Sequence, residues 1–540
     1  MKKLLSLGEI LMIVALAFVP LLGSFPYRFN IFLSYEGAYR LYDGQVPYKD
    51  FGMPLGYMYW VVPAAFFKIF GPYMMSLVKA QVFLNIVGGL SFRSILKSLK
   101  VNEGIRFLSI LLFIISYSFL NYWPWYNNTV IIYELVALAL LLKVIFNPQA
   151  KWKWVWLCVS AVFVFFSFFT KQDGGGMAFL VSFFIIVYNA WQQKNWKQPL
   201  VFLAALAITG LVMILPSLSH NFNYWFNYGQ PPHTSRFSFS DIAEDFFNSS
   251  QWIKFYLFII LLLLLAHIKS LKAFLQDQHK MVFTLLTLGI LVEAAIFQTT
   301  SYIPPDNNIF FHSFAIAFIL AMSAPFLPVD FTQFKTVFIG VVGIMLWWSS
   351  AYWKYLEKYI TKPAPAITNT DGLVNKKTYL ITIPDTTDVP AHLWRKVPYK
   401  AFENMLLPGP TVDGIDRLLN MPLVKNNKNL QVLNMTELTP LVHEMKYKLE
   451  KSPEYPLWYH KGVGMFQKET DMFVNRIKNN YYDLVLFEYI PYLNNFYPFQ
   501  VREALLQQYE KVDVFTAPRK PSMQAWVEVY VKKKPAGNQQ

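Results

Sequence analysis

The segment from Ser34 to Leu55 holds the residues of this chain best suited to proton transfer beside an apolar surface. It carries Glu36 and Asp50 among tyrosines, glycines and prolines, shortly after the first long apolar run. A carboxylate in such a place can take a proton from an acceptor hydroxyl or serve as a metal ligand. We therefore choose Glu36 as the candidate base or metal ligand, and Asp50 as the second candidate.

A non-catalytic interpretation of this segment is also open. Its composition is typical of a solvated surface loop with an amphipathic helix. Asp50 could equally be the N-cap of a helix that lies on the membrane surface.

The composition of the chain indicates a membrane protein. Of its 540 residues, 55% are hydrophobic and only 15% are charged, against roughly 25% charged residues in an average soluble domain. The net charge of +15 does not indicate a nucleic-acid partner, because the apolar part places its positive charges at helix ends, where they set orientation. The single cysteine, Cys158, excludes a disulfide within the chain.

Twelve apolar runs are candidates for membrane spans, each of which needs roughly 20 residues. They cover residues 10–24, 54–70, 73–96, 107–123, 129–146, 154–169, 177–190, 199–217, 252–268, 281–299, 309–327 and 336–352. The first run lacks a small-x-small cleavage site and is interrupted by Glu9, so we interpret it as an uncleaved span rather than a signal peptide.

Charge bias reduces the spans to eleven. With the N-terminus in the cytoplasm and 54–70 lying at the outer surface, the lysine-rich loops fall on the cytoplasmic side. Pro54, Gly56, Pro63 and Gly71 also favour an interfacial helix over a span. The substantial outer loops are then 25–72 and 218–251, and the C-terminal part lies outside the cytoplasm.

The C-terminal part alternates between short helices and strands, which predicts a small α/β domain. We expect a transmembrane domain at 1–352, a linker at 353–370 and an extracytoplasmic α/β domain at 371–540. Strands are predicted at 379–383, 430–433, 482–487, 512–515 and 525–531, and helices at 470–478 and 500–509. No Gly-rich phosphate loop follows a strand here.

Four ionisable residues fall inside the spans, where they are costly. Lys79, Glu134, Glu293 and His312 each lie in the outer third of a span, on the order of 10 Å below the surface at 1.5 Å per residue. We expect a shared polar cavity open to the outside, with Tyr302 at its rim. The alternative is that Lys79 snorkels to the surface and each acid pairs with a neighbouring helix.

The segment after the first span resembles the first extracytoplasmic loop of GT-C glycosyltransferases. The similarity is to the protein O-mannosyltransferase/aminoarabinose-transferase-like family, which uses polyprenyl-phosphate sugars. The matching residues are Glu36, Tyr39, Gly44, Pro47, Tyr48, Asp50, Pro54 and Leu55. Two positions depart from the family pattern, because Tyr35 stands where an Asp is common and Gly52-Met53 where some members have a Lys.

The resemblance implies further binding residues for the donor phosphate. Tyr39 belongs to the motif, and Lys171 lies at the outer end of a span where the family has a similar lysine. His233 and Arg236 lie in the second outer loop, where family members use His and Arg. We add Tyr302 and His312 as substrate-binding candidates. Without the resemblance, Lys171 is equally an interface lysine and His233 a solvated loop residue.

The leading hypothesis is an inverting glycosyltransferase of a bacterial inner membrane. It would move a sugar from a polyprenyl-phosphate donor to a lipid, glycan or protein acceptor on the outer face, and a divalent metal ion at Glu36 is its candidate cofactor. Its partners would be the donor, the acceptor and membrane lipids. Alternatives are a lipid-linked-glycan transporter or flippase, which would favour charges at the midplane and broken helices, and a non-catalytic membrane scaffold.

Overall fold

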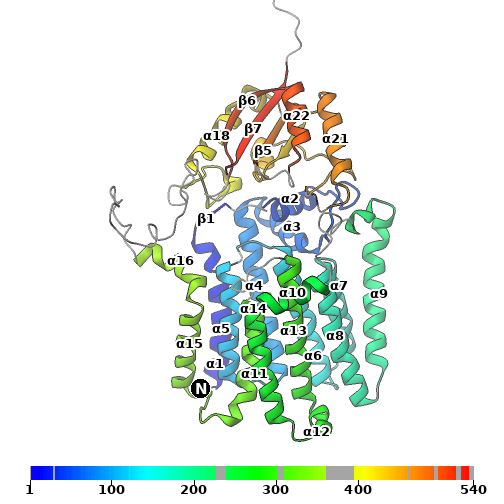
Figure 1. Cartoon of the computed structure of the whole chain (residues 1–540), viewed down its shortest axis with the longest axis vertical. Helices are drawn as coiled ribbons and strands as arrows, with labels where there is room; N and C mark the ends of the chain where they lie inside the picture. Colours follow the sequence, from blue (N-terminus) through cyan, green and yellow to red (C-terminus); the bar gives the residue numbers. More distant parts are fainter. Residues whose placement is uncertain are drawn as a thin grey trace, which may run out of the picture.

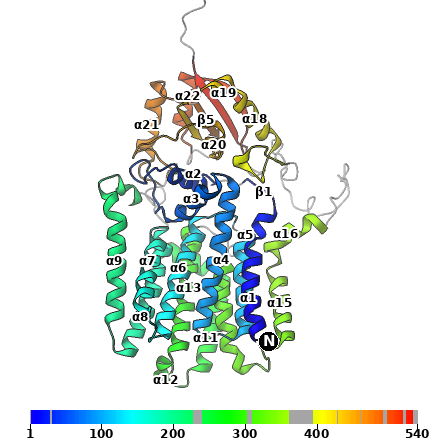
Figure 2. The same cartoon turned by 180° about the vertical axis from the view of Figure 1, so that it is seen from behind.

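The computed structural model describes residues 2–27, 31–120, 122–226, 239–301, 309–360, 394–427, 429–459, 461, 463–491, 497–518 and 524–533. A bundle of long helices carries a smaller α/β domain at one end, and the N-terminus lies at the other end (Figure 1). The same arrangement is seen from behind in Figure 2. The prediction of a helical membrane protein with a C-terminal α/β domain is confirmed.

The bundle contains eleven apolar helices within the described residues. They are α1 (Lys2–Ala17), α4 (Met74–Ser98), α5 (Glu103–Leu120), α6 (Tyr126–Phe146), α7 (Lys153–Phe168), α8 (Gln172–Gln193), α9 (Lys197–Leu218), α11 (Gln251–His267), α13 (Gln278–Ser301), α14 (Ile309–Ser323) and α15 (Phe334–Trp347). By length and composition six of these can cross a membrane alone, counting α1 with the turn that follows it. A seventh qualifies if α11 is joined to α10 (Phe239–Ser249), from which it is bent by 82°.

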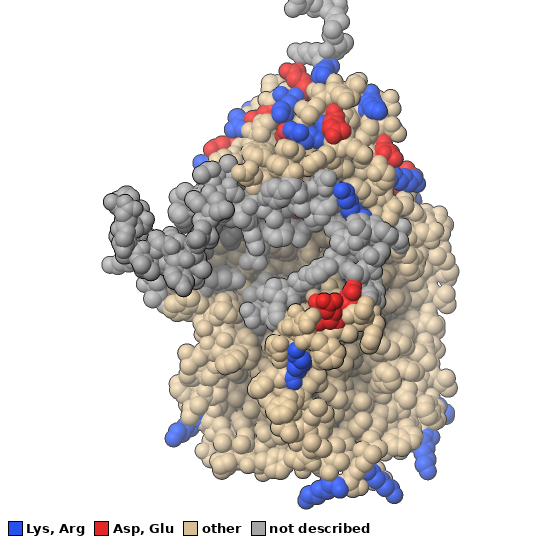
Figure 3. All heavy atoms as spheres, in the orientation of Figure 1, with Lys and Arg blue, Asp and Glu red and all other residues tan. Residues whose placement is uncertain are grey.

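Charged side chains are unevenly distributed along the length of the bundle. On the face shown in Figure 3, Lys and Arg gather at the end of the bundle away from the C-terminal domain, while the middle of the bundle carries few charged side chains. An uncharged belt of this kind is what a protein surface in contact with lipid requires.

Two helices lie between the bundle and the C-terminal domain (Figure 1). These are α2 (Ile31–Tyr42) and α3 (Met58–Phe70). The 13 residues of α3 span about 20 Å, less than the roughly 30 Å of a bilayer core. The helix contains Pro63 and ends at Phe70, and the following residue, Gly71, has a φ of 88°. This length agrees with an interfacial helix in the 54–70 region.

The C-terminal domain is built on a four-stranded sheet of order β4-β5-β7-β6. Its strands are β4 (Val432–Met435), β5 (Leu484–Tyr489), β6 (Tyr509–Thr516) and β7 (Trp526–Lys532). β4 and β5 are parallel and the other pairs antiparallel. The helices packed around it are α18 (Gly409–Asn420), α21 (Phe466–Lys478) and α22 (Phe499–Gln508). The predicted strands and helices after residue 429 are confirmed, whereas the strand predicted at 379–383 lies outside the described residues.

A second, three-stranded sheet joins the segment after α1 to the first described part of the C-terminal domain. Its order is β1-β3-β2, and β1 (Phe25–Pro26) pairs in parallel with β3 (Met405–Leu407). β2 (Arg395–Lys396) lies antiparallel to β3 on the other side. The chain leaving α1 thus adds a strand to the C-terminal domain. A two-residue strand has too short a pattern to be predicted from sequence.

The remaining described elements are short connections. They are η1 (Val19–Leu22), η2 (Phe222–Phe226), α12 (Leu271–Gln276), η5 (Ala324–Phe326), α16 (Ser349–Ile360), η7 (Lys400–Phe402), α19 (Pro422–Asn426) and α20 (Leu441–Met445).

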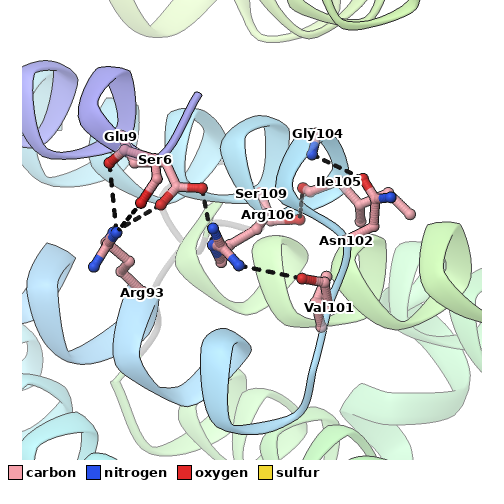
Figure 4. Close-up of polar contacts among 9 residues, drawn as sticks. All are labelled: Ser6, Glu9, Arg93, Val101, Asn102, Gly104, Ile105, Arg106 and Ser109. Carbon is pink, nitrogen blue, oxygen red and sulfur yellow. Dashed lines mark hydrogen bonds and ion pairs between the residues drawn. The ribbon is translucent and has the colours of Figure 1, made fainter. Parts of the chain in front are cut away.

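An ion-pair cluster fastens α1 into the bundle near the N-terminal end (Figure 4). Glu9 is fully buried, and its two carboxylate oxygens accept from Arg93 Nε of α4 at 2.7 Å and Arg106 Nε of α5 at 2.8 Å. Arg93 also donates to the Ser6 hydroxyl at 2.7 Å. The acid that interrupts the first apolar run is therefore a structural link between three helices.

Candidate functional site

Glu36 and Arg40 form an ion pair on α2. They are four residues apart and so share a face of the helix. Arg40 Nε lies 3.0 Å and Nη2 lies 2.8 Å from Glu36 Oε1. The Arg40 side chain is fully buried, whereas the Glu36 side chain keeps 12% of its surface exposed. No described residue donates a hydrogen bond to Glu36 Oε2. One oxygen of Glu36 is thus fixed by Arg40, whereas the other accepts no hydrogen bond from the described residues.

Arg40 is held from three other directions. Its Nη1 donates to Gln45 Oε1 at 2.7 Å and to the backbone carbonyl of Glu450 at 2.9 Å. The guanidinium carbon lies 5.2 Å from the centre of the Phe51 ring and 4.7 Å from that of Tyr455. A buried guanidinium needs such partners because an unsatisfied buried charge is costly. The ion pair is therefore rigid.

Burial and Arg40 act on the proton affinity of Glu36 in opposite senses. Burial raises the pKa of Glu36, while the charge and hydrogen bonds of Arg40 lower it. Burial prevails, so the pKa stays above that of an ordinary glutamate. A raised pKa brings a carboxylate closer to the proton affinity of an effective general base at neutral pH.

The motif residues after α2 build the loop that holds this pair. Gly44 and Tyr48 take left-handed φ angles of 78° and 65°, and the second value is uncommon for an aromatic residue. The Tyr48 hydroxyl donates to the Leu55 carbonyl at 2.8 Å. Asp50 Oδ2 accepts from Val46 N at 2.7 Å and so caps the turn. The carboxylate of Asp50 is used within the loop.

The helix N-cap alternative for Asp50 is wrong. α3 begins at Met58, and the residue in its N-cap position is Tyr57. Asp50 is seven residues earlier and closes a turn rather than a helix, because its short side chain reaches a backbone N–H four residues back. We keep its catalytic role as a prediction only.

α2 and α3 pack closely enough to exclude a side chain between them. A Cβ on Gly37 would lie 1.9 Å from the Trp60 ring. The Trp60 indole Nε1 donates to the Leu33 carbonyl at 2.5 Å. Ser34 Oγ donates to the Pro124 carbonyl at 2.6 Å and ties α2 to the segment before α6. These contacts fix α2, and with it Glu36, on the end of the bundle.

The C-terminal domain contacts the loop after α2 through residues 449–459, which we call the docking segment. Ser452 N donates to the Asp50 carbonyl at 2.8 Å. Gly52 N donates to the Tyr455 carbonyl at 2.7 Å, and Leu457 N donates to the Gly52 carbonyl at 2.9 Å. These bonds form a short parallel β-bridge. Two parts of the chain that are distant in sequence thus enclose the Glu36–Arg40 pair.

A second contact joins the domain to the turn after α9. The Tyr224 hydroxyl of η2 donates to Glu469 Oε1 of α21. Burial raises the pKa of Glu469 to about 8. Tyr224 also covers the loop, because a Cβ on Gly52 would lie 2.4 Å from its ring. The neutral form of Glu469 is therefore the one best suited to this interface near neutral pH.

Tyr39 lies on α2 within a group of aromatic side chains. Its ring centre is 6.0 Å from that of Tyr35 and 5.7 Å from that of Tyr42. Burial raises the pKa of Tyr39 to about 12. The phenol is thus a neutral hydrogen-bond donor, as a substrate-binding role would require.

Lys171 occupies the N-cap position of α8 and is largely buried. Its Nζ lies 2.6 Å from Asp173 Oδ2, 3.5 Å from the Thr300 hydroxyl and 4.0 Å from the centre of the Phe297 ring. Asp173 thus already neutralises this lysine, which reduces its capacity for a phosphate.

The four ionisable residues inside the spans have two kinds of surroundings. Glu134 of α6 and Glu293 of α13 are buried, and their carboxyl groups interact with each other. Lys79 Nζ lies 4.3 Å from the centre of the Phe70 ring. His312 Nδ1 lies 2.9 Å from the Tyr256 hydroxyl, with its ring against Trp252. The structure brings the two acids together and gives Lys79 and His312 separate contacts.

Three candidates lie outside the described residues, namely His233, Arg236 and Tyr302. The shared cavity with Tyr302 at its rim remains a prediction.

A divalent metal at Glu36 would need several further oxygen or nitrogen ligands beside this carboxylate. Within the described part of the chain, no group of three or more His, Cys, Asp or Glu side chains converges as metal ligands do. Arg40 also places a positive charge on Glu36 Oε1. The described residues therefore do not fit a metal ion at this position.

Arg40, Gln45 and Glu450 were not among the residues predicted from the sequence. The Glu36–Arg40 spacing of four residues was a detectable signal, because a Glu followed by Arg at i+4 pairs on a helix. The contribution of Glu450 is a backbone carbonyl, which leaves no signal in the sequence.

Comparison with known proteins gives a likeness in fold. No protein-family model matches the sequence, and no curated protein is similar to it. ArnT from Cupriavidus metallidurans, in a crystal structure bound to undecaprenyl phosphate, superposes with a TM-score of 0.50 at 12% identity, over 100% of this chain and 99% of that one. Its apo state gives 0.49 at 12% identity, over 99% and 100% of the two chains. The oligosaccharyltransferase AglB from Archaeoglobus fulgidus gives 0.34 at 8% identity, over 89% of this chain and 58% of that one. The GT-C-like fold predicted from the sequence is confirmed by the first of these.

Proposed function

We propose that this protein is a membrane glycosyltransferase that moves a sugar from a polyprenyl-phosphate donor to a lipid, glycan or protein acceptor. The observation that carries the proposal is the Glu36–Arg40 pair. It places one fixed carboxylate, buried except for 12% of its side-chain surface, where the end of an apolar bundle meets a water-exposed domain. A lipid-linked donor and a polar acceptor can meet at such a junction.

The likeness in fold supports the class of donor. ArnT was crystallised with undecaprenyl phosphate, and it covers the whole length of this chain. The sequence motif between Glu36 and Leu55 independently resembles enzymes that use such donors. We therefore assign a polyprenyl-phosphate sugar as the donor and leave the sugar itself unspecified.

The proposed reaction is a single displacement at the anomeric carbon. Glu36 Oε2 takes the proton of the acceptor hydroxyl as the acceptor oxygen bonds to that carbon. The bond between the carbon and the phosphate oxygen breaks, and polyprenyl phosphate leaves with the bonding electrons. Attack opposite the leaving group inverts the configuration. The proton then passes from Glu36 to water.

The phosphate leaving group needs positive charge or hydrogen-bond donors. Lys171 is paired with Asp173, so we assign the main cationic role to His233 and Arg236. Tyr39 would donate from its neutral phenol, and Tyr302 and His312 remain substrate-binding candidates. Asp50 would act through the loop that it caps rather than on the substrate. Because the described residues do not fit a metal ion at Glu36, no step of this mechanism uses one.

We further propose that the site faces outward from a bacterial inner membrane. Lys and Arg on the visible face gather at the bundle end away from the C-terminal domain. Positively charged loops favour the cytoplasm. The C-terminal domain and Glu36 would then lie on the extracytoplasmic side.

The test is transfer by the purified protein. It is incubated in detergent or vesicles with a panel of polyprenyl-phosphate sugars and candidate acceptors, and release of free polyprenyl phosphate is followed. At least one donor should be consumed in an acceptor-dependent way. If no donor on the panel is consumed, with lipid or glycan or peptide acceptors, the proposal is wrong.

A further inference from the structure

Three residues of the docking segment contact Arg40 or its partner Gln45. Glu450 supplies its carbonyl to Arg40 Nη1 at 2.9 Å, across 410 residues of sequence. Tyr455 lays its ring over the same guanidinium. Leu449 accepts from Gln45 Nε2 at 3.3 Å, and Gln45 is itself a partner of Arg40.

We propose that the docking segment of the C-terminal domain is part of the catalytic machinery, because it holds Arg40 as the positioning residue of Glu36. This inference rests on the proposed function, in which Glu36 is the base. Arg40 acts through Glu36, and Tyr455 and the Glu450 carbonyl act through Arg40.

An arginine needs this support to position a carboxylate. A Glu–Arg pair four residues apart on an exposed helix contributes only about 0.3–0.5 kcal/mol, because two long side chains lose rotamer freedom to form it. Here four N–H groups of Arg40 are each bonded, two to Glu36 and one each to Gln45 and Glu450. The ring of Phe51 restrains one side of the guanidinium and that of Tyr455 another. Two of these restraints come from the C-terminal domain.

The docking segment is itself held in place by its own domain. The Glu450 carboxylate forms an ion pair with Arg476 of α21 and accepts from the Tyr482 hydroxyl at 2.9 Å. Tyr455 packs into the hydrophobic cluster of the domain with Phe473 and Tyr482. The carbonyl and the ring therefore reach Arg40 from a rigid base.

Loss of this support has a defined consequence. A loosened Arg40 would bond Glu36 Oε1 for less of the time. The carboxylate would then sample other rotamers, and the positive charge that favours its ionised form would weaken. The C-terminal domain would thereby affect turnover itself and not only the affinity for the acceptor.

The experiment compares Tyr455→Ala with Arg40→Lys in the full-length protein. Tyr455→Ala should lower kcat about 10-fold through misplacement of the base, with the KM for donor within about twofold of wild type. The acidic limb of its pH–rate profile should move to higher pH. Arg40→Lys keeps the positive charge but lacks the planar guanidinium that bonds Glu36 and Glu450 at the same time. Its kcat should therefore fall, while the acidic limb of its pH–rate profile should move less than that of Tyr455→Ala.

Arg502→Ala serves as the matched control. Arg502 pairs with Glu528 inside the C-terminal domain at 2.7 Å and stacks on Tyr489. Within the described part of the chain it contacts none of residues 36–52, so its loss should leave kcat and the pH profile unchanged. The positioning role is refuted if Arg502→Ala moves the acidic limb of the pH–rate profile as Tyr455→Ala does. It is also refuted if Tyr455→Ala retains both the kcat and the acidic limb of wild type. Should Tyr455→Ala not fold, Tyr455→Leu keeps the apolar volume without the aromatic face and is judged by the same two readouts.

A readout without activity separates this inference from the proposed function. Hydrogen exchange of peptides covering residues 44–56 reports the bonds of Gly52 and of the turn. Tyr455→Ala should raise exchange there, and Arg502→Ala should not. If the wild-type protein is inactive but the variants show this exchange pattern, the proposed glycosyltransferase function is wrong, whereas the contact between the domain and Arg40 is supported. An active wild type with unchanged exchange in Tyr455→Ala would overturn the inference alone.

Discussion

Arg40 directs two N–H groups, Nε at 3.0 Å and Nη2 at 2.8 Å, to the same oxygen of Glu36, Oε1. The other carboxylate oxygen accepts no hydrogen bond from the described residues. The pair is therefore asymmetric, with a bound oxygen that fixes the carboxylate and a second oxygen that can meet a substrate.

Replacement of the base should remove turnover. Glu36→Gln keeps the size of the side chain and one acceptor for Arg40, but the amide cannot take a proton. We expect release of polyprenyl phosphate to fall about 10²- to 10⁴-fold, the usual contribution of a positioned base. Glu403→Gln, an exposed glutamate of the C-terminal domain, should retain activity. Full activity of Glu36→Gln would exclude Glu36 as the base.

The pH dependence of turnover should show the raised pKa of Glu36. A base works only when ionised, so activity should rise with pH through the pKa of this carboxyl. Because burial raises that pKa against the opposing effect of Arg40, the midpoint should lie above the roughly 4.3 of an unperturbed glutamate. The measurement is kcat/KM against pH in a constant-ionic-strength buffer. A midpoint at the ordinary value would contradict burial of the carboxylate.

Glu469 should make stability depend on pH. Its folded pKa of about 8 exceeds the unfolded value, so the folded state holds the proton more tightly. Its contribution is fully present below roughly pH 4.3 and is lost as pH rises to about 8, with a slope of up to about 1.4 kcal/mol per pH unit. Unfolding midpoints measured from pH 5 to 9 should fall accordingly.

Two variants identify Glu469 as the source of that slope. Glu469→Gln keeps an acceptor for Tyr224 and cannot titrate, so its profile should be flatter than that of wild type. Glu503→Gln changes an exposed glutamate of α22 and should leave the slope unchanged. An equal slope in wild type and Glu469→Gln would show that another group causes it.

A side chain at Gly37 should separate α2 from α3. The added Cβ would lie 1.9 Å from the Trp60 ring, and overpacking of this kind costs about 1–3 kcal/mol. Gly37→Ala should therefore lower both the unfolding midpoint and kcat, because α2 carries the base. Gly343→Ala on α15, where the Cβ meets nothing within 4 Å, should be neutral or slightly stabilising. Equal stability of the two variants would argue against the close packing.

Glu9 should stabilise the bundle without affecting the site. Glu9→Gln leaves an amide facing two arginines, Arg106, which is buried, and Arg93, which is half-buried. Breaking a buried ion pair costs about 3–5 kcal/mol, so the unfolding midpoint should fall sharply. The donor KM of the protein that remains folded should be unchanged. Glu103→Gln, at the start of α5, is the control and should unfold close to wild type.

Parts of this architecture were predictable because their cause is local. The apolar runs reveal the helices through length alone, and Leu484 to Phe487 is an uninterrupted apolar run, as expected of a strand buried on both faces. Glu36 was identified as the leading candidate from its place in a motif. Glu9 was noticed only as an interruption, because its partners Arg93 and Arg106 lie 84 and 97 residues away.

The C-terminal contribution was not predictable in the same way. A backbone carbonyl such as that of Glu450 is present at every residue, so nothing in the sequence distinguishes it. The strand β1 has two residues and no periodicity. Asp50 was misassigned as a possible helix cap because an Asp before a helix and an Asp within a turn use the same short acceptor.

The sequence by itself determined that this chain enters a membrane, which segments are helices and strands, and that Glu36 lies in the segment between the first span and the next. Periodicity and apolar length are properties of neighbouring residues, and they need no tertiary contact. Only the tertiary structure decided which oxygen of Glu36 is fixed and that residues 449–459 help to fix it. That outcome depends on bringing groups 410 residues apart to within 2.9 Å, and only the packing of the whole chain sets such a distance.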